Sequence, residues 1–218
     1  MAVDDNGIMR LALTGKMRSG KSMLADHLWL FYDYTRLSFG EELKRLADDL
    51  FADSDVYEFE PKYEWDSLAG DLNEHGLPTG DYVQVGHKKP RKLYQDIGQK
   101  LRELDEDVWV RQVADGVKLY SEYRTTKGLV ITDLRQPNEY EWARDNGFTI
   151  IRINAGEETR LQRANNAGDD FTTEDLRHET EIHIESFEVD YEIYNGEGTT
   201  EKAVKDELNA IIRELRGE

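Results

Sequence analysis

The chain alternates short apolar runs with longer segments in which apolar residues recur every three or four positions. The first pattern predicts buried strands, and the second predicts amphipathic helices. Strands are expected at residues 8–13, 34–39, 129–131, 148–153 and 189–194. Helices are expected at residues 20–32, 41–51, 91–104, 108–123, 137–145, 157–165 and 200–215. This alternation predicts an α/β fold, with a mostly parallel sheet and helices on both of its faces.

Local signals define several of these helices more closely. Leu24, Leu28 and Phe31 are spaced as one apolar side of the first helix. Pro137 stands where a helix begins, and proline is well tolerated at a first helical position. Thr200 precedes the last amphipathic run and is expected to cap it.

One long segment, residues 52–90, breaks the alternation. It is acidic, aromatic and turn-rich, and it holds three of the four prolines. A stretch of this length is long for a plain loop, so it is interpreted as a substrate-side insertion or lid, with a disordered insertion as the alternative. Residues 157–187 are interpreted as a lid-like segment. No linker separates independent units, so residues 1–218 are expected to form a single domain.

The most informative motif is GKMRSGKS at residues 15–22, which matches G-x-x-x-x-G-K-[ST] between a predicted strand and a predicted helix. Gly15 and Gly20 allow a tight bend that turns backbone N–H groups toward an anion. Lys21 would reach the phosphates of a nucleotide, and the Ser22 hydroxyl would bind Mg²⁺. The alternative is a glycine-rich turn without a ligand. The other loop residues assigned to the nucleotide site are Lys16, Arg18 and Ser19.

Composition narrows the classes of partner. The formal net charge is −18, because 46 acidic residues outnumber 28 basic ones, and such a surface repels polynucleotides. The chain has no cysteine, which excludes disulfides and thiolate chemistry. No apolar run approaches the roughly 20 residues that cross a bilayer, and the first residues do not resemble a signal peptide. We therefore expect small-molecule nucleotides as ligands, no polymeric nucleic acid, no membrane, a cytoplasmic location and a possible homodimer.

Charged residues follow two of the predicted strands. Asp133 comes just after the apolar run 129–131, so it should stand at the carboxyl edge of the sheet, where it can bind Mg²⁺ or orient an attacking oxygen. Arg135 can contact a phosphate. The alternative is that Asp133 caps a turn and Arg135 is a surface charge. Arg160 and Arg163 lie three apart on one helix face and can close over a transferring phosphoryl group, or simply face solvent.

The segment ITDLRQPNE at residues 131–139 resembles the D-[VL]-R-x-x-N-E block of bacteriophage-type deoxynucleoside monophosphate kinases. Several further stretches are similar to that family in kind and order. They are GKMRSGKS, SFGEELKRLADDLF, PRKLYQDIGQKLRELDEDVWV, HETE and YEIYNGEGT. Departures from the pattern include Tyr94, Gln136, Thr180 and the segment 52–90.

The resemblance implies a three-layer P-loop kinase related to adenylate and dephospho-coenzyme A kinases. It implies transfer of the γ-phosphate of ATP to a deoxynucleoside 5′-monophosphate, with Mg²⁺ as cofactor and the host cytoplasm as location if a phage encodes the chain. Lys21 and Ser22 would hold ATP and Mg²⁺, while Asp133 and Arg135 would serve the transferring phosphate. The acceptor or the lid would be contacted by Lys44, Arg91, Gln95, Asn138, Glu139, His178 and Glu181.

Alternatives remain open at the level of the sequence. Lys44 can instead pair with Asp48 one turn away, and Arg91 and Gln95 can belong to an ordinary surface. A P-loop kinase acting on another small or modified-base acceptor is one rival function. A nucleotide-dependent switch or ATPase without an acceptor is another, although the chain has no base-reading N-K-x-D motif.

Overall fold

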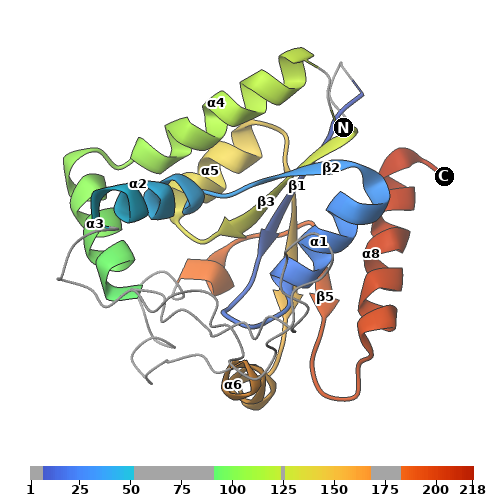
Figure 1. The fold of residues 1–218 in the computed structure, drawn as a ribbon. Coiled ribbons are helices and arrows are strands. Elements are labelled where there is room, and N and C mark those ends of the chain that lie inside the picture. Colours follow the sequence, from blue (N-terminus) through green and yellow to red (C-terminus); the bar gives the residue numbers. More distant parts are fainter. Residues whose placement is uncertain (1–6, 52–90, 124–125, 168–182) are drawn as a thin grey trace, which may run out of the picture.

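The computed structural model describes residues 7–51, 91–123, 126–167 and 183–218. Its five strands form one sheet in the order β2-β3-β1-β4-β5, and every pairing is parallel (Figure 1). The strands are β1 (Met9–Thr14), β2 (Tyr34–Leu37), β3 (Gly128–Leu134), β4 (Thr149–Asn154) and β5 (Tyr191–Tyr194). The predicted α/β class with a parallel sheet is confirmed.

Helices cover both faces of this sheet (Figure 1). Their bounds are α1 (Lys21–Tyr32), α2 (Glu41–Phe51), α3 (Arg91–Leu104), α4 (Val108–Tyr123), α5 (Pro137–Asp145), α6 (Glu157–Asn166) and α8 (Glu201–Arg216), with a short 3-10 helix η2 (His183–Ser186) before β5. Two local predictions are confirmed. Pro137 occupies the first turn of α5, and the Thr200 hydroxyl accepts a hydrogen bond from the Ala203 amide at 3.2 Å.

Alternate residues of the strands build two separate cores. Leu11 and Leu13 of β1 pack with α1 and α8 on one face, whereas Ala12 faces α4 and α5 on the other. Because side chains alternate across a strand, a strand that is buried on both faces is apolar throughout. This explains why the central strands β1, β3 and β4 are mostly apolar in sequence, whereas the edge strands β2 and β5 carry exposed residues.

The strand register places three loops at the same level of the carboxyl edge. Thr14 of β1 pairs with Leu134 of β3, so the phosphate loop and Arg135 begin side by side. The Thr14 hydroxyl donates to the Leu134 carbonyl at 2.9 Å and ties these strand ends together. Leu37 of β2 pairs with Ile131, which brings the chain after β2 to the same edge. Ligands of open parallel sheets bind at this edge.

Two expectations about individual positions are wrong. Phe31 was expected on the buried side of α1, but its side chain is 71% exposed, while Leu24, Ala25 and Leu28 are buried. The strand predicted at 129–131 is longer at both ends, so Asp133 lies within β3 rather than beyond it. The polar residues Thr132 and Asp133 hide the true length of the strand, because they end the apolar run, while pairing with β1 resumes at Leu134 after a register shift.

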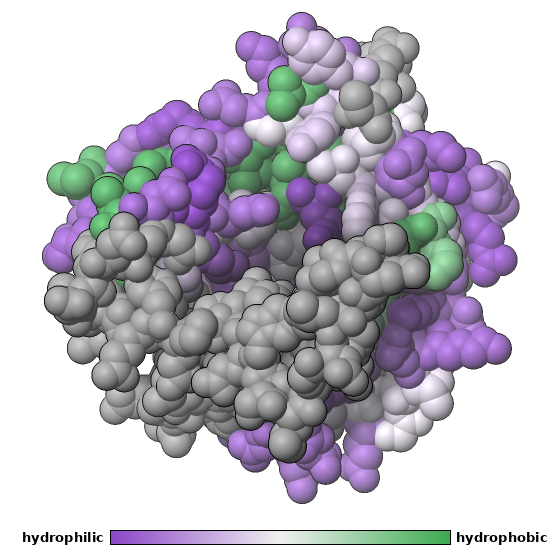
Figure 2. Space-filling model, viewed as in Figure 1, coloured by the Kyte–Doolittle hydropathy of each residue, from purple (hydrophilic) through white to green (hydrophobic). Residues whose placement is uncertain are grey.

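Some expectations fall outside the described residues. These are the interpretation of residues 52–90, most of the lid-like segment after α6, and the roles of His178 and Glu181. In the part of the chain that is described, no helix combines the length and apolar character needed to cross a bilayer. Hydrophilic residues dominate the coloured surface in Figure 2, in keeping with the charged composition.

Candidate functional site: a cationic cavity around the phosphate loop

The phosphate loop has the backbone conformation that its two fixed glycines predict. Gly15 and Gly20 both have positive φ, at 141° and 109°. A Cβ atom on Gly15 would lie 2.4 Å from the Ile153 carbonyl oxygen, and one on Gly20 would lie 2.2 Å from Nδ2 of Asn195. Both positions therefore require glycine for conformation and for space.

The N-terminus of the helix that follows the loop has no side-chain cap and is open to a bound anion. Gly20 is the N-cap of α1 and supplies no side-chain hydrogen bond, and the first turn of α1 has no acidic residue. The helices α2, α5, α6 and α8 each carry an acid there, whereas α3 and α4, like α1, do not. Since the N-terminus of a helix carries partial positive charge, α1 leaves this charge for a ligand.

Lys21 is held inside the loop. Its side chain is only 8% exposed, and its ammonium donates to the Gly15 carbonyl and, at 3.0 Å, to the Lys16 carbonyl. Ser22, the next residue, is exposed on the cavity. The Lys16 side chain points elsewhere and pairs with Glu185 of η2, an ion pair that lowers the pKa of Glu185. Lys21 is thus placed as the cation of the loop, whereas Lys16 ties the loop to η2.

A cavity of about 630 Å³ opens in front of the phosphate loop. Its walls come from the loop, the start of α1, the ends of β3 and β5 and the start of α8. Among the described residues, two carboxylates line it, those of Asp133 and Glu201. The cations that line it are Arg18, Lys21, Lys44, Arg135 and Arg163. The fold therefore concentrates positive charge here although the whole chain carries −18, which favours an anionic ligand.

The two arginines of α6 occupy different environments. Arg163 lines the cavity, donates to the Arg18 carbonyl at 3.3 Å and donates to Oδ1 of Asn195 at 3.0 Å. Arg160 is 5% exposed and donates to the Met17 carbonyl at 3.4 Å. Arg163 is therefore the arginine that can meet a ligand, and Arg160 braces the loop beneath it.

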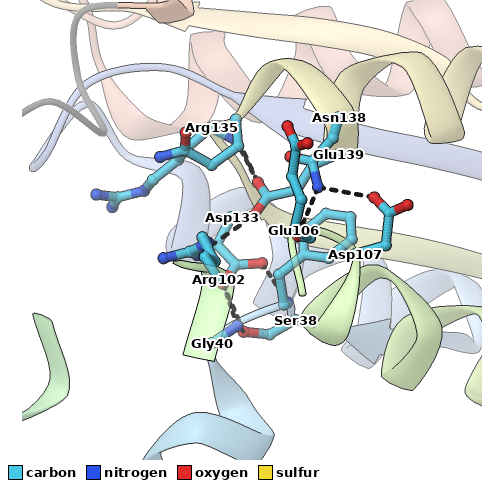
Figure 3. A network of polar contacts seen from close by, with 11 residues as sticks. Ser38, Gly40, Arg102, Glu106, Asp107, Asp133, Arg135, Asn138 and Glu139 are labelled. Atoms are coloured by element: carbon cyan, nitrogen blue, oxygen red, sulfur yellow. Dashed lines mark hydrogen bonds and ion pairs between the residues drawn. The ribbon is translucent and has the colours of Figure 1, made fainter. Parts of the chain in front are cut away.

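Asp133 is engaged with the start of α2. Its Oδ2 accepts hydrogen bonds from the Ser38 hydroxyl at 2.7 Å and the Gly40 amide at 2.9 Å, and its Oδ1 accepts from the Phe39 amide at 2.9 Å (Figure 3). The carboxylate thus fixes the turn between β2 and α2 to the end of β3. It still borders the cavity, so it joins the phosphate loop side of the site to α2.

The segment after Asp133 is organised by a buried carboxylate. Glu139 is 3% exposed, and its Oε2 accepts hydrogen bonds from the amides of Arg135 and Gln136 at 2.9 and 3.0 Å, as a capping box at the start of α5. Arg102 lies 3.6 Å from its Oε1. Asn138 donates to the Glu106 carbonyl and to Asp107, in the connection before α4 (Figure 3). Glu139 and Asn138, predicted to bind substrate, hold Arg135 and the neighbouring helices in position through these contacts, and their contact with substrate stays a prediction.

Burial, followed by the nearby charge of Asp133, raises the pKa of Glu139 to about 7. Folded Glu139 therefore keeps a proton that the unfolded chain loses near the ordinary value of 4.5. Because the folded state binds more protons in this window, stability falls as the pH rises from about 4.5 to 7. Relative to Glu139→Gln, we expect the free energy of unfolding of the wild type to fall by roughly 1.4 kcal/mol per pH unit.

Urea unfolding of both proteins at intervals between pH 5 and 8 measures this difference, which should level off above pH 7. Glu141→Gln, on the exposed side of the same helix, is the matched control and should follow the wild type. A wild type whose stability changes with pH in parallel with Glu139→Gln would contradict the assignment.

Three other residues, Lys44, Arg91 and Gln95, were predicted to contact the acceptor substrate. Lys44, on α2, lines the cavity in front of the phosphate loop and also a second cavity of about 550 Å³ between α1, β2 and α2. Gln95 is half-buried on α3. Arg91 is the first residue of α3, and its side chain is outside the described part of the structure. Of these residues, Lys44 is thus the one that the fold brings to the phosphate loop.

The oxygen donors suit a magnesium ion that arrives with a nucleotide. The Ser22 hydroxyl and the Asp133 carboxylate border the same cavity. Within the described residues, no group of three or more acidic or histidine side chains could hold a metal ion by itself. Magnesium typically takes one or two protein oxygens and completes its shell with water and substrate phosphates. The two donors fit that arrangement, with Asp133 acting through water because its oxygens already accept three hydrogen bonds.

Sequence reasoning missed Asn195. In the sequence it stands out only as part of the stretch YEIYNGEGT, yet it is 5% exposed, lines the cavity and contacts both the phosphate loop and Arg163. The available signal was its position directly after the short edge strand β5, of which only Ile193 is buried. The same reasoning had singled out Asp133 after an apolar run.

No protein-family model matches the sequence, and no curated protein matches it either. Solved structures do match the fold. A crystal structure of TT1252 from Thermus thermophilus aligns with a TM-score of 0.50 and 16% identity, over 94% of this chain and 96% of that one. At this identity the likeness concerns the fold alone.

Two further structures align over similar lengths with lower TM-scores. Dephospho-CoA kinase from Campylobacter jejuni has a TM-score of 0.46 and 13% identity, over 94% of this chain and 96% of that one. Shikimate kinase from Acinetobacter baumannii, in complex with shikimate, has a TM-score of 0.47 and 15% identity, over 96% and 94%. We draw no conclusion from these two likenesses.

Proposed function

We propose that this protein is a P-loop kinase that transfers the γ-phosphate of ATP to a deoxynucleoside 5′-monophosphate. The observation that carries the proposal is the cationic cavity built on the phosphate loop, which Lys21 and Arg163 line together with the start of α1. A cavity with this charge, in a chain of net charge −18, selects for a highly charged anion.

The donor half of the reaction is assigned to the phosphate loop. The amides at the start of α1 and the Lys21 ammonium would bind the β- and γ-phosphates. Arg163 and Arg135 border the same space from opposite sides of the loop, and would offset the charge that spreads over the transferring group. Mg²⁺, held by Ser22 and through water by Asp133, would neutralise phosphate charge when bound.

The acceptor half is assigned to the second cavity. It shares Ser22, Ser38, Lys44 and Thr132 with the first, so the two cavities adjoin. Of the cations that line it, Arg36 is paired with Asp26, and Arg45 with Glu42 and Asp49. Lys44 has no ion-pair partner among the described residues and stands where the cavities meet. It is therefore the cation best placed to hold the phosphate of an acceptor.

This arrangement suits an acceptor that is already a nucleophile. A monophosphate has a second pKa of about 6, so it is ionised at neutral pH and needs no strong general base. The protein's task is then to align the acceptor oxygen with the γ-phosphate and to stabilise charge. Asp133, bonded to the turn that begins α2, would contribute by holding the acceptor side in place.

A panel of acceptors tests the proposal. The protein is incubated with ATP and Mg²⁺, and with dAMP, dGMP, dCMP, dTMP, dephospho-coenzyme A, modified-base DNA or no acceptor, and the products are separated by chromatography. We expect ADP and a deoxynucleoside diphosphate to form in equal amounts with at least one deoxynucleoside monophosphate.

Two outcomes would contradict the proposed reaction. ATP consumption that is the same with and without acceptors would indicate an ATPase or a nucleotide-dependent switch. Transfer to dephospho-coenzyme A or to modified DNA, but to no deoxynucleoside monophosphate, would support kinase activity and contradict the proposed acceptor.

A further inference from the structure

Asn195 lies where the last strand of the sheet meets the phosphate loop. It follows β5 directly, and its backbone amide donates to the Asn154 carbonyl at 2.7 Å, which continues the pairing of β4 with β5 by one residue. The side chain is 95% buried, since its exposed fraction is 5%. The backbone pairing therefore fixes the position from which the side-chain amide of Asn195 extends.

The side-chain amide makes two hydrogen bonds of opposite polarity. Its Nδ2 donates to the Ser19 carbonyl at 2.8 Å, and its Oδ1 accepts from Nη2 of Arg163 at 3.0 Å. An aspartate would have no donor for the Ser19 carbonyl, and a serine would be too short to reach both partners. Both ends of the amide are thus used, one on the phosphate loop and the other on α6.

The phosphate loop makes room for this contact. Nδ2 of Asn195 occupies the space that a Cβ atom on Gly20 would enter. Arg163 also donates through Nη1 to the Arg18 carbonyl, so its guanidinium is attached to the loop directly and, through Asn195, at a second point. Two attachments on different nitrogens fix the orientation of a planar guanidinium, whereas one would leave it free to rotate.

We propose that Asn195 is a positioning residue for nucleotide binding, and that its amide holds the Arg163 guanidinium against the phosphate loop before the nucleotide arrives. This inference rests on the proposed use of the cavity by ATP. A cation that is already oriented loses less conformational freedom on binding, so its contribution to affinity is larger. Asn195 would therefore act through Arg163 rather than by contacting the phosphates itself.

A double-mutant cycle tests this mechanism. The dissociation constants of ATP and ADP are measured by calorimetry, without any acceptor, for the wild type, Asn195→Ala, Arg163→Ala and the double variant. Loss of Arg163, or of the amide that orients it, should weaken ATP binding about tenfold in each single variant. If Asn195 acts through Arg163, the double variant should bind ATP no more than about twofold more weakly than Arg163→Ala.

Asn165→Ala, the same change on an exposed residue of α6, is the matched control and should bind ATP like the wild type. If Asn195→Ala does not fold, Asn195→Ser keeps a polar group at the position but cannot span the two partners, and the same cycle applies. Independent losses that multiply to about a hundredfold, or an Asn195 variant with unchanged affinity, would overturn the inference. Wild-type protein that binds no ATP would overturn this inference and the proposed function together, whereas ATP binding without transfer would overturn only the proposed reaction.

Discussion

Replacing Lys21 by alanine is expected to lower kcat/KM for phosphoryl transfer by about a thousandfold. The ammonium of Lys21 lies within the bend of the phosphate loop, where it donates to the carbonyls of Gly15 and Lys16. No other cation is held inside the described part of the loop in this way, because Lys16 points to Glu185 and Arg18 is exposed. Its loss therefore removes the positive charge nearest to the proposed position of the γ-phosphate.

The measurement is steady-state transfer from ATP to the best acceptor, with thermal unfolding to confirm that the variant is folded. Lys118→Ala, on the exposed side of α4, removes the same side chain outside the cavity lining and should retain wild-type turnover. Near-normal turnover in a folded Lys21→Ala protein would remove the basis of the proposed mechanism.

The architecture followed from the sequence because its signals are local. A strand that is buried on both faces must be apolar throughout, and an anion-binding loop between strand and helix requires glycine at fixed positions. Both signals are complete within about 25 residues of the start of β1. The order of the strands was not predicted, because it depends on which strands pair across the chain. That order nevertheless determines the site, since it places β3 next to β1.

The side-chain roles were harder to predict because their partners are distant in sequence. Asp133 was correctly expected near the phosphate loop, yet its hydrogen bonds go to the turn at Ser38–Gly40, more than 90 residues away. The sequence places Arg160 and Arg163 on the same face of a helix and does not distinguish them. Only the packing shows that Arg160 is buried while Arg163 reaches the cavity. Spacing identifies candidates, whereas burial and hydrogen bonding separate contact residues from supporting ones.

Replacing Asp133 by alanine is expected to lower kcat/KM for the acceptor while leaving ATP binding nearly unchanged. Asp133→Ala removes three hydrogen bonds, those from the Ser38 hydroxyl and from the Phe39 and Gly40 amides. The turn that begins α2, and with it Lys44, would lose its fixed position relative to the phosphate loop. At about 1 kcal/mol for each bond, we expect kcat/KM for the acceptor to fall about a hundredfold. The dissociation constant of Mg²⁺·ATP should change less than about threefold, because Asp133 would reach the metal only through water.

Two further variants separate this positioning role from a metal-ligand role. In Asp133→Asn, the remaining oxygen can still accept the Phe39 amide, but the new NH₂ group cannot accept the Gly40 amide, so kcat/KM should lie between those of the wild type and the alanine variant. Asp115→Ala, an exposed acid on α4, controls for the loss of one negative charge. If Asp133→Ala instead weakens Mg²⁺·ATP binding about a hundredfold and leaves the KM for the acceptor unchanged, the carboxylate serves the metal. The hydrogen bonds to the α2 turn would then be secondary to that role, because losing them would leave acceptor binding intact.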